Sequence, residues 1–404
     1  MSKIVRARLF SKKLLDFLFY QSASVNPVLD SITPQAIANS FSAILAPVKD
    51  HRRTSKGNIQ YSIDEIFFFT LAGVISGCDS WEAIALFGKY KIEWFRNFFP
   101  YRKGTPSADT LERFYAKLSK ETFGEFFIRW ASSHLQSLDN EVVSIDGKRL
   151  RGSYDKSNEQ AALHIVSAYA SANRLTLGQV ATEEKSNEIT AIPQLLDLIE
   201  VKDTVVSIDA MGCQKEIVKK IREKKADYLI AAKENQKELT RNIQQSFDLL
   251  AVKDSHVWMD KGHGRIENRT CEIIDSLDWM ETKEEWKDLR TLVRIRSERT
   301  IITTGEAQSQ IRYYISSKIA DAQTFNKIVR SHWAIENNLH WVLDVTFKED
   351  ASRRRKGNSA YNFNIIAKIA LKLIDQHKEK RTRASTRMVA SASDEFRTLI
   401  FKGF

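Results

Sequence analysis

Two short runs of β-branched apolar residues share one sequence and form the clearest pattern in the chain. Val142–Ile145 and Val205–Ile208 both read VVSI, and an aspartate follows each run. Runs of this composition are typical of strands buried on both faces of a sheet. Because the carboxyl ends of neighbouring parallel strands converge on one crevice, we expect Asp146 and Asp209 to lie close together there. The alternative is two helix-capping aspartates that follow unrelated strands.

The pattern around these runs alternates between strand and helix. Strand-like runs at 163–170 and 175–182 follow the first VVSI run, and a helix at about 188–199 leads to the second. A helix at 214–224 then precedes a last strand at 227–231. Three strands, a helix, a strand, a helix and a strand is the order of the ribonuclease H-like fold. The sequence therefore predicts an α/β protein with a ribonuclease H-like catalytic core.

Helical periodicity flanks this core. Residues 49–137 read as an all-helical N-terminal domain, in which Ser62-Ile63-Asp64-Glu65 has the form of a capping box. Short helices joined by tight turns suit a DNA-binding domain, and they equally suit a plain helical bundle. From about residue 233 to 320 the pattern loses its helical character and shows strand runs, so we expect a β-rich insertion at about 240–320. The expected organisation is a basic helical segment at 1–48, the helical domain at 49–137, the catalytic core at 138–375 and a basic C-terminal tail at 376–404.

Charge and composition narrow the class of protein. The 404 residues include 62 Lys and Arg against 51 Asp and Glu, a net charge of +11 that favours a polyanionic partner. Three widely spaced cysteines indicate a reducing compartment and no zinc cluster. The longest apolar run, at 66–76, is too short to span a membrane, and Asp16 interrupts the basic and apolar N-terminus, so we expect no signal peptide. We therefore expect a cytoplasmic protein without a membrane partner and, lacking a GxxxxGK[ST] motif, without a nucleotide cofactor.

A helix expected at 325–343 supplies a third carboxylate. His332, Glu336 and His340 fall on one face of this helix, four residues apart each time. The two histidines are about 12 Å apart along the axis and cannot share one ion. Glu336 is therefore the candidate ligand, with Asp344 and Asp350 as alternatives.

Three carboxylates from two strands and a late helix are what two-metal phosphodiester chemistry requires. Hard oxygen ligands suit Mg²⁺, with Mn²⁺ as a substitute, and we expect two ions. Basic side chains would bind the flanking phosphates and make the affinity depend on salt. The candidates for these phosphate contacts are Lys148, Arg149, Arg151, Lys233 and the basic loop Arg353, Arg354 and Arg355.

Several linked motifs resemble those of bacterial insertion-sequence transposases. They are SIDGKRLRGS (144–153), SIDAMGCQ (207–214), AAKENQ (231–236) and HWAIENNLHWVLDVTFKED (332–350). The most similar branch is the ISAs type, which includes the H-repeat-associated proteins, and the resemblance covers about residues 45–375. It implies a DDE transposase with the catalytic and metal-binding triad Asp146, Asp209 and Glu336.

The glutamate helix departs from the family pattern at three positions. Broader relatives carry tyrosine, arginine and lysine where this glutamate helix has Val329, His332 and Leu343. We therefore expect phosphate contacts from Arg330, His332 and Asn337 instead.

The resemblance also implies a function. The implied protein binds the inverted-repeat ends of its element as double-stranded DNA, cuts them and joins the 3′-hydroxyls to target DNA, as a homodimer or a higher assembly. The alternatives are a domesticated sequence-specific DNA-binding protein without transposition and a stand-alone metal-dependent nuclease.

Overall fold

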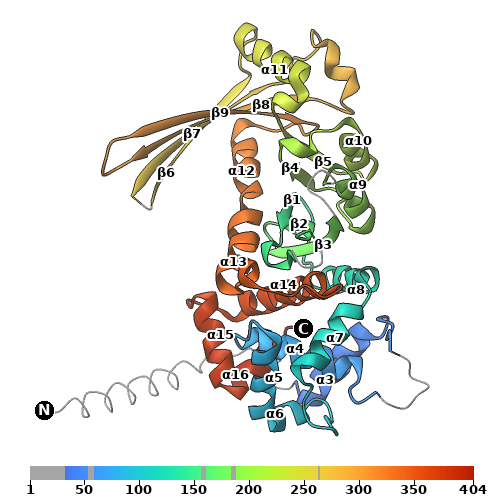
Figure 1. The fold of residues 1–404 in the computed structure, drawn as a ribbon. Coiled ribbons are helices and arrows are strands. Elements are labelled where there is room, and N and C mark those ends of the chain that lie inside the picture. The colour runs from blue at the N-terminus through green and yellow to red at the C-terminus, as the bar shows by residue number, and fades with distance from the viewer. Residues whose placement is uncertain (1–31, 53–58, 156–160, 183–187, 263) are drawn as a thin grey trace, which may run out of the picture.

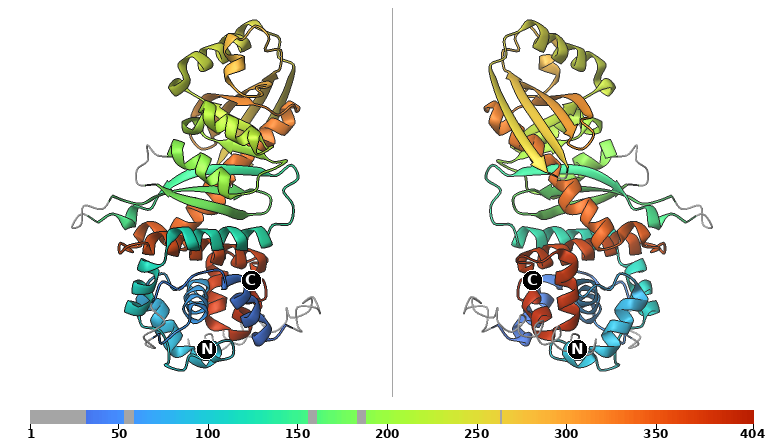
Figure 2. Two further views of the ribbon diagram at one scale, coloured as in Figure 1. Left: turned by 90° about the vertical axis from the view of Figure 1, so that its right-hand side faces the viewer. Right: turned by 90° about the vertical axis from the view of Figure 1, so that its left-hand side faces the viewer.

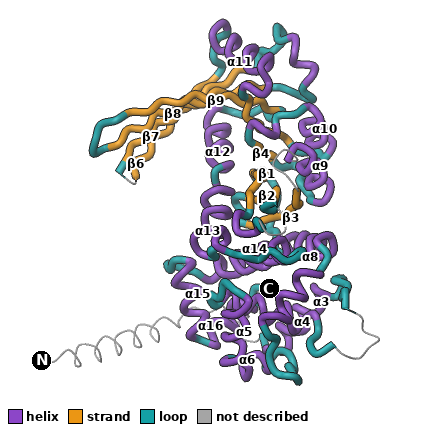
Figure 3. Tube along the Cα trace, viewed as in Figure 1, coloured by secondary structure: helices purple, strands orange, loops and turns teal. Residues whose placement is uncertain are grey.

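The computed structural model describes residues 32–52, 59–155, 161–182, 188–262 and 264–404. Within these ranges the chain forms a mixed α/β molecule with one nine-stranded sheet and many helices (Figure 1). A block of helices occupies one end, and the last strands of the sheet project from the other (Figure 3). Most of the expected basic segment at 1–48 lies outside the described residues. In the part of the chain that the structure describes, no helix is long and apolar enough to cross a membrane.

The helical block is built around aromatic side chains. Its N-terminal helices are α3 (Pro34–Leu45), α4 (Ile63–Ile75), α5 (Trp81–Tyr90), α6 (Ile92–Arg96), α7 (Ala108–Lys117) and α8 (Lys120–Ser133). The predicted capping box begins α4: Ser62 Oγ accepts the N–H of Glu65 at 3.1 Å, and Glu65 Oε2 accepts the N–H of Ser62 at 2.8 Å. Phe67, Phe68 and Phe69 of α4 are almost fully buried. A helix that is apolar on all sides belongs in a core, so α4 lies at the centre of this block.

The C-terminal helices complete the same block (Figure 2). They are α14 (Ser359–His377), α15 (Arg383–Ala392) and α16 (Asp394–Phe401). Helix α14 packs against α4, α7 and α8 and also against strand β3 (Leu175–Thr182). Arg397 of α16 is fully buried, with its guanidinium 4.1 Å from the centre of the Trp94 ring. Residues 376–404, expected to form a basic tail, therefore contain two helices that fold onto the helical block.

The first five strands of the sheet follow the predicted alternation of strands and helices. Its elements are β1 (Val142–Arg149), β2 (His164–Ala170), β3, α9 (Glu188–Leu198), β4 (Val205–Ile208), α10 (Lys215–Glu223) and β5 (Asp227–Ala232). The sheet has the order β3-β2-β1-β4-β5-β9-β8-β7-β6, with β1, β4 and β5 parallel and β2 and β3 antiparallel. Ile145 pairs with Ile208 at the end of the β1–β4 ladder. Asp146 and Asp209 each follow this pair, so they lie side by side where the pairing of β1 and β4 ends.

The last four strands extend this sheet. They are β6 (Asp254–Gly262), β7 (Arg265–Ile274), β8 (Thr291–Ile301) and β9 (Ala307–Ser316), and β9 pairs antiparallel with β5. The expectation that helical character is lost from about residue 233 is wrong at its start, because α11 (Lys237–Leu249) is a helix. Its Leu239, Ile243 and Phe247 recur every four residues and bury one face.

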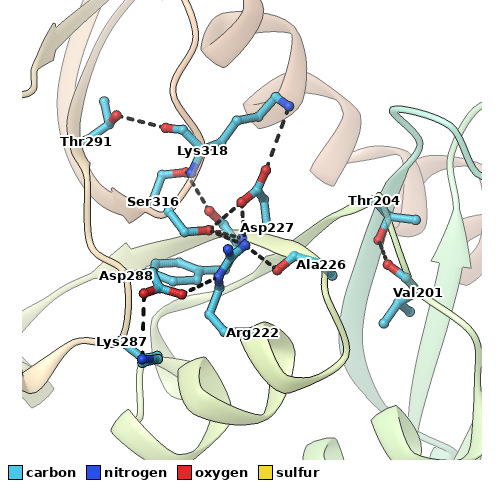
Figure 4. Close-up of polar contacts among 12 residues, drawn as sticks. Val201, Thr204, Arg222, Ala226, Asp227, Lys287, Asp288, Thr291, Ser316 and Lys318 are labelled. Carbon is cyan, nitrogen blue, oxygen red and sulfur yellow. Dashed lines mark hydrogen bonds and ion pairs between the residues drawn. The ribbon is translucent and has the colours of Figure 1, made fainter.

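Polar contacts join the extension to the core sheet (Figure 4). Arg222 of α10 donates to Asp227 Oδ1 at 2.6 Å and to Asp288 Oδ2 at 2.9 Å. Ser316 Oγ of β9 donates to the carbonyl of Tyr228 at 2.5 Å. One arginine thus links the start of β5 to the loop before β8, and the two parts of the sheet form one surface.

Helices cover both faces of the sheet (Figure 1). Helices α9 and α10 pack against β2, β3 and β5. On the other face α12 (Ala322–His332) packs against β1, β4, β6 and β7. Phe325, Ile328 and Val329 of α12 share a buried apolar cluster with Val142 and Val205 of the two VVSI strands. This cluster fixes the helix that leads to Glu336 against the strands that lead to the two aspartates.

Candidate active site

Asp146 and Asp209 lie side by side at the point where β1 and β4 stop pairing. The Oδ1 atom of Asp146 accepts the N–H of Gly147 at 2.8 Å. Asp209 begins the turn η5 (Ala210–Gly212), where its Oδ1 accepts the N–H of Met211 at 3.0 Å. The Asp146 side chain is 24% exposed and Asp209 is exposed. Asp209 therefore has the capping role of the alternative interpretation, and it also lies beside Asp146 within reach of a ligand.

Glu336 lies on a short π-helix. Helix α12 is followed by the π-helix η8 (Ile335–His340) and by α13 (Trp341–Thr346). The N–H of Trp341 donates to the carbonyl of Glu336, five residues earlier, where a regular helix would use a residue four earlier. The expectation of one regular helix at 325–343 is therefore wrong in its middle, because the wider turn changes the angular spacing of the side chains around Glu336. Turns of this kind occur frequently at functional sites.

The three carboxylates act on one another electrostatically. Partial desolvation and the charge of Asp146 raise the pKa of both Asp209 and Glu336. Desolvation also opposes the ionisation of Asp146, but His340 and His332 outweigh it and lower the pKa of Asp146. The Nδ1 atom of His340 lies 3.3 Å from Asp146 Oδ2. Burial lowers the pKa of His332, whereas the two aspartates act in the opposite direction. Negative charge therefore gathers at one place, with imidazole groups beside it.

The residues at this place fit a divalent cation in charge and in donor chemistry. Carboxylate oxygens are the ligands that Mg²⁺ and Mn²⁺ prefer, and like charges held together favour a cation between them. The Nδ1 atom of His332 and the Nε2 atom of His340 are buried and have no hydrogen-bond partner among the described residues. Orphaned polar atoms of this kind point to a partner outside the polypeptide. Over the described ranges, no group of three or more Asp, Glu, His or Cys side chains lies in an arrangement that could hold a metal ion without movement of the side chains.

The basic residues expected to contact phosphates near the aspartates are of two kinds, exposed residues and one residue that is already paired. Three are exposed, namely Arg149, Arg151 and Lys233. Arg151 also lies 3.7 Å from Asp350. Lys148 differs, because its side chain is only 12% exposed and its ammonium group contacts protein carboxylates. Lys148 is therefore already paired within the protein.

The basic loop at 353–355 is also divided. Arg353 is exposed and Arg355 is half-buried, but Arg354 is 6% exposed. The Arg354 guanidinium donates to the carbonyl of Asp79 at 2.7 Å and lies 3.2 Å from the centre of the Phe363 ring. Arg354 therefore belongs to the interior, and the expected phosphate contact by this side chain is corrected.

A groove of about 1310 Å³ runs from Glu336 along the β6–β9 strands. One wall is formed by α12 and η8 and includes Arg330, Glu336 and Asn337; the other is the sheet. Five arginines line the groove: Arg265, Arg269, Arg299, Arg312 and Arg330. Arg265, Glu267 and Arg269 alternate along β7, which places them on one face of the strand, whereas Arg299 and Arg312 were not expected from the sequence.

Two cation–π contacts join the walls of this groove. The Arg330 guanidinium of α12 lies 3.8 Å from the centre of the Trp258 ring of β6. The Arg312 guanidinium of β9 lies 4.7 Å from the centre of the Trp333 ring, just before η8. Arg330 also pairs with Asp260 at 3.4 Å. These contacts hold the projecting strands against the helix that carries Glu336.

Comparison with known proteins places this geometry in a family. The family described as "Transposase DDE domain" matches residues 137–373, and one described as "DDE_Tnp_1-associated" matches residues 42–131. The chain is 41% identical over 331 residues to "Putative transposase YncI" of Escherichia coli O157:H7, covering 80% of this chain and 85% of the relative. It is 38% identical over 356 residues to "H repeat-associated putative transposase YhhI" of Escherichia coli K12, covering 86% and 93% of the two chains.

Proposed function

The chain belongs to the DDE-domain transposase family, and we propose that it binds the inverted-repeat ends of an insertion sequence and catalyses metal-dependent strand cleavage and strand transfer. One observation carries the proposal most directly. Asp146 and Asp209 follow the paired residues Ile145 and Ile208 of β1 and β4, and desolvation and both aspartates raise the pKa of Glu336, which comes from a distant part of the chain. The antiparallel and parallel pairing in the order β3-β2-β1-β4-β5 supports a ribonuclease H-like core around them.

In this proposal Asp146, Asp209 and Glu336 would hold two Mg²⁺ ions, for which Mn²⁺ could substitute. When bound, the ions would stabilise the charge that develops on the phosphodiester oxygens. His340 keeps Asp146 ionised, since its ring lowers the pKa of that carboxyl group. The exposure of Asp209 and Glu336 leaves their carboxylates open to the DNA side.

Glu336 is the third carboxylate in preference to Asp344 and Asp350. Its pKa is raised by desolvation and by both aspartates of the site. The Oδ1 atom of Asp344 instead accepts a hydrogen bond from Lys148 at 2.5 Å. Asp350 lies beside Arg151.

The arginine-lined groove is the proposed path of the DNA backbone into the site. Arg269 is paired with Glu267 at 2.6 Å and Arg330 with Asp260. Arg299 is exposed. Phosphates that follow the groove would meet arginines before reaching Glu336, and binding would depend on salt concentration. Asn337 lines the groove next to Glu336, and Arg149 and Lys233 would contact the flanking phosphates.

The proposal extends to the other units of the chain. The helical block that includes residues 49–137 would recognise the element ends, and the core at 138–375 would carry the chemistry. A homodimer or a larger assembly is part of the proposal, because two ends must be held together during strand transfer. Light scattering with and without end DNA measures this assembly.

The test is cleavage of DNA carrying the element ends, with Mg²⁺ or Mn²⁺, by the wild type, Asp146→Asn and Glu336→Gln. Asp248→Asn on the exposed side of α11 is the matched acid-to-amide control. We expect cleavage at the ends by the wild type and the control, and loss of cleavage in both site variants. Activity retained by Glu336→Gln would move the third carboxylate to Asp344 or Asp350.

The same assay separates the alternatives. Tight end binding without wild-type cleavage would indicate a domesticated DNA-binding protein. Cleavage that ignores the ends and yields no joined products would indicate a stand-alone nuclease. Either outcome would overturn the proposed transposase activity.

A further inference from the structure

Lys148 makes three contacts with the segment that follows Glu336. It lies on β1 two residues after Asp146, so both side chains point to the same face of the sheet. Its Nζ atom donates to the carbonyl of His340 at 3.2 Å, to Asp344 Oδ1 at 2.5 Å and to Glu349 Oε2 at 2.7 Å. An ammonium group has three donors, and these contacts use all of them.

The three acceptors lie on three successive elements. His340 is the last residue of the π-helix η8, Asp344 is on α13, and Glu349 begins the turn η9 (Glu349–Ala351). A π-helical turn is rare and needs support from its surroundings. A hydrogen bond from Lys148 to the carbonyl of His340, where the π-helix passes into α13, ties this turn to β1.

Glu349, the last of these three acceptors, is also held by helix α14. The second carboxylate oxygen of Glu349 accepts a hydrogen bond from Asn364 Nδ2 of α14 at 2.6 Å. Asn364 is 2% exposed, and α14 is packed within the helical block. A continuous set of contacts therefore runs from β1 through Lys148 and Glu349 to α14.

We propose that Lys148 is a positioning residue that fixes the π-helix, and with it Glu336 and His340, against Asp146. This inference rests on the proposed function, in which those three residues form the active site. Protein acceptors occupy all three donors of Lys148, so this role replaces the contact of Lys148 with a DNA phosphate that was expected from its sequence position.

The adjacent residue Arg149, proposed above as a phosphate contact, is the comparison for DNA binding, and the exposed Lys219 on α10 is the control for activity. The side chain of Arg149 points to the opposite face of β1 and is exposed, so Arg149→Met removes a neighbouring positive charge without touching η8. Lys148→Met keeps the length of the side chain and removes its donors. Glu349→Gln weakens the same set of contacts from the other side.

Single-turnover cleavage and DNA affinity separate the two roles. We expect Lys148→Met to slow cleavage at least tenfold, because small displacements of catalytic groups are costly. Its affinity for end DNA should stay within twofold of the wild type. Lys148→Met combined with Glu349→Gln should be no slower than Lys148→Met alone, since both act through one set of contacts. Arg149→Met should weaken DNA binding. Lys219→Met, at an exposed position on α10, should leave both the DNA affinity and the single-turnover rate unchanged.

Hydrogen exchange provides a readout that does not need activity. Amide exchange over 335–346 should accelerate in Lys148→Met, while α12 keeps its protection. If the wild type failed to cleave DNA, the proposed function would fail, and this measurement would still test the contacts of Lys148. Unchanged exchange in Lys148→Met would overturn the inference. So would weaker DNA binding with a smaller salt dependence at an unchanged cleavage rate, because Lys148 would then be a phosphate contact. If Lys148→Met does not fold, Glu349→Gln carries the same two measurements, with the same results expected or overturning.

Discussion

The imidazole of His340 lies 3.3 Å from the carboxylate of Asp146, although the two residues are far apart in the sequence. This contact joins the end of the π-helix to the strand that carries the first aspartate. It is also the contact that keeps Asp146 ionised, because His340 outweighs desolvation and lowers the pKa of the carboxyl group. The pH at which Asp146 ionises therefore depends on its contact with His340.

Replacing His340 by alanine should raise the pKa of Asp146. Asp146 would then protonate at higher pH, so the acid limb of Mn²⁺ binding should move upward by about 1 pH unit. Mn²⁺ affinity measured by calorimetry between about pH 3 and 6, where the Asp146 carboxyl group titrates, tests this. His256→Ala, on β6, should leave the limb where it is. A limb that does not move in His340→Ala would contradict the electrostatic role of His340.

Neutralising the other two carboxylates should stabilise the metal-free protein. Asp209 and Glu336 have raised pKa values, so their charged forms are disfavoured in the folded state, and the penalty is present at neutral pH. Asp209→Asn and Glu336→Gln should each raise the melting temperature by about 1 °C without metal and reduce the further rise caused by Mn²⁺. Asp248→Asn should keep the Mn²⁺ response of the wild type. A lower melting temperature for both site variants would show that these carboxylates stabilise the fold instead.

Removing arginines from the groove should change the salt dependence of DNA binding. Each phosphate contact contributes about one unit to the slope of log affinity against log salt concentration. Arg265→Ala and Arg299→Ala should therefore each weaken binding and lower the slope by about one. Arg241→Ala, an exposed arginine on α11, serves as the control and should leave the slope unchanged. Unchanged slopes in both groove variants would remove the groove from the DNA path.

The local sequence pattern was sufficient to predict the two aspartates and the strands before them. VVSI reads as a buried strand by itself, and parallel strands carry their following residues to one edge, so Asp146 and Asp209 could be brought together without coordinates. The capping box at Ser62 was equally local, because it depends on two residues within one turn.

Other features depend on contacts between distant residues, which one sequence does not reveal. The π-helix at Glu336 is supported by Lys148, far earlier in the chain, and periodicity alone favoured a regular helix. The pairing of β5 with β9 likewise decides that the last strands extend the core sheet. The basic neighbours of Arg354 favoured an exposed side chain, but its guanidinium packs against the ring of Phe363.

The arginines of the basic loop should separate into a stabilising residue and a surface residue. Arg354→Ala should lower the free energy of unfolding by about 2–4 kcal/mol, because it leaves the carbonyl of Asp79 unpaired and opens a space beside Phe363. Arg353→Ala, at an exposed position, should change it by less than about 0.5 kcal/mol. Chemical denaturation of both variants provides the comparison. Equal effects would indicate that the burial of Arg354 contributes little to stability.

A buried lysine in α14 should make stability depend on pH. Burial lowers the pKa of Lys368 to about 7, and its Nζ atom donates to Ser167 Oγ at 2.8 Å and to Gln179 Oε1 at 2.6 Å. The unfolded chain keeps the ordinary lysine pKa, so it binds more protons than the folded protein between about pH 7 and 10. Stability should therefore rise with pH across this window, by at most about 1.4 kcal/mol per unit. Denaturation of Lys368→Met at pH 7, 8 and 9 should show a flatter dependence than the wild type, and an equal slope would assign the effect to other groups.

The return of the last helices to the first ones has a consequence for synthesis on the ribosome. The centres of the Phe404 and Phe41 rings lie 4.5 Å apart, as do those of Phe401 and Phe68, so aromatic residues at the two ends of the described chain share one core. A nascent chain exposes α3 to α8 and then the strands of the sheet long before α16 leaves the ribosome. The helical block can therefore close only after the whole sheet has been translated. Chains interrupted within the core would expose the aromatic surface of α4 and be open to degradation, which couples the supply of folded protein to uninterrupted translation.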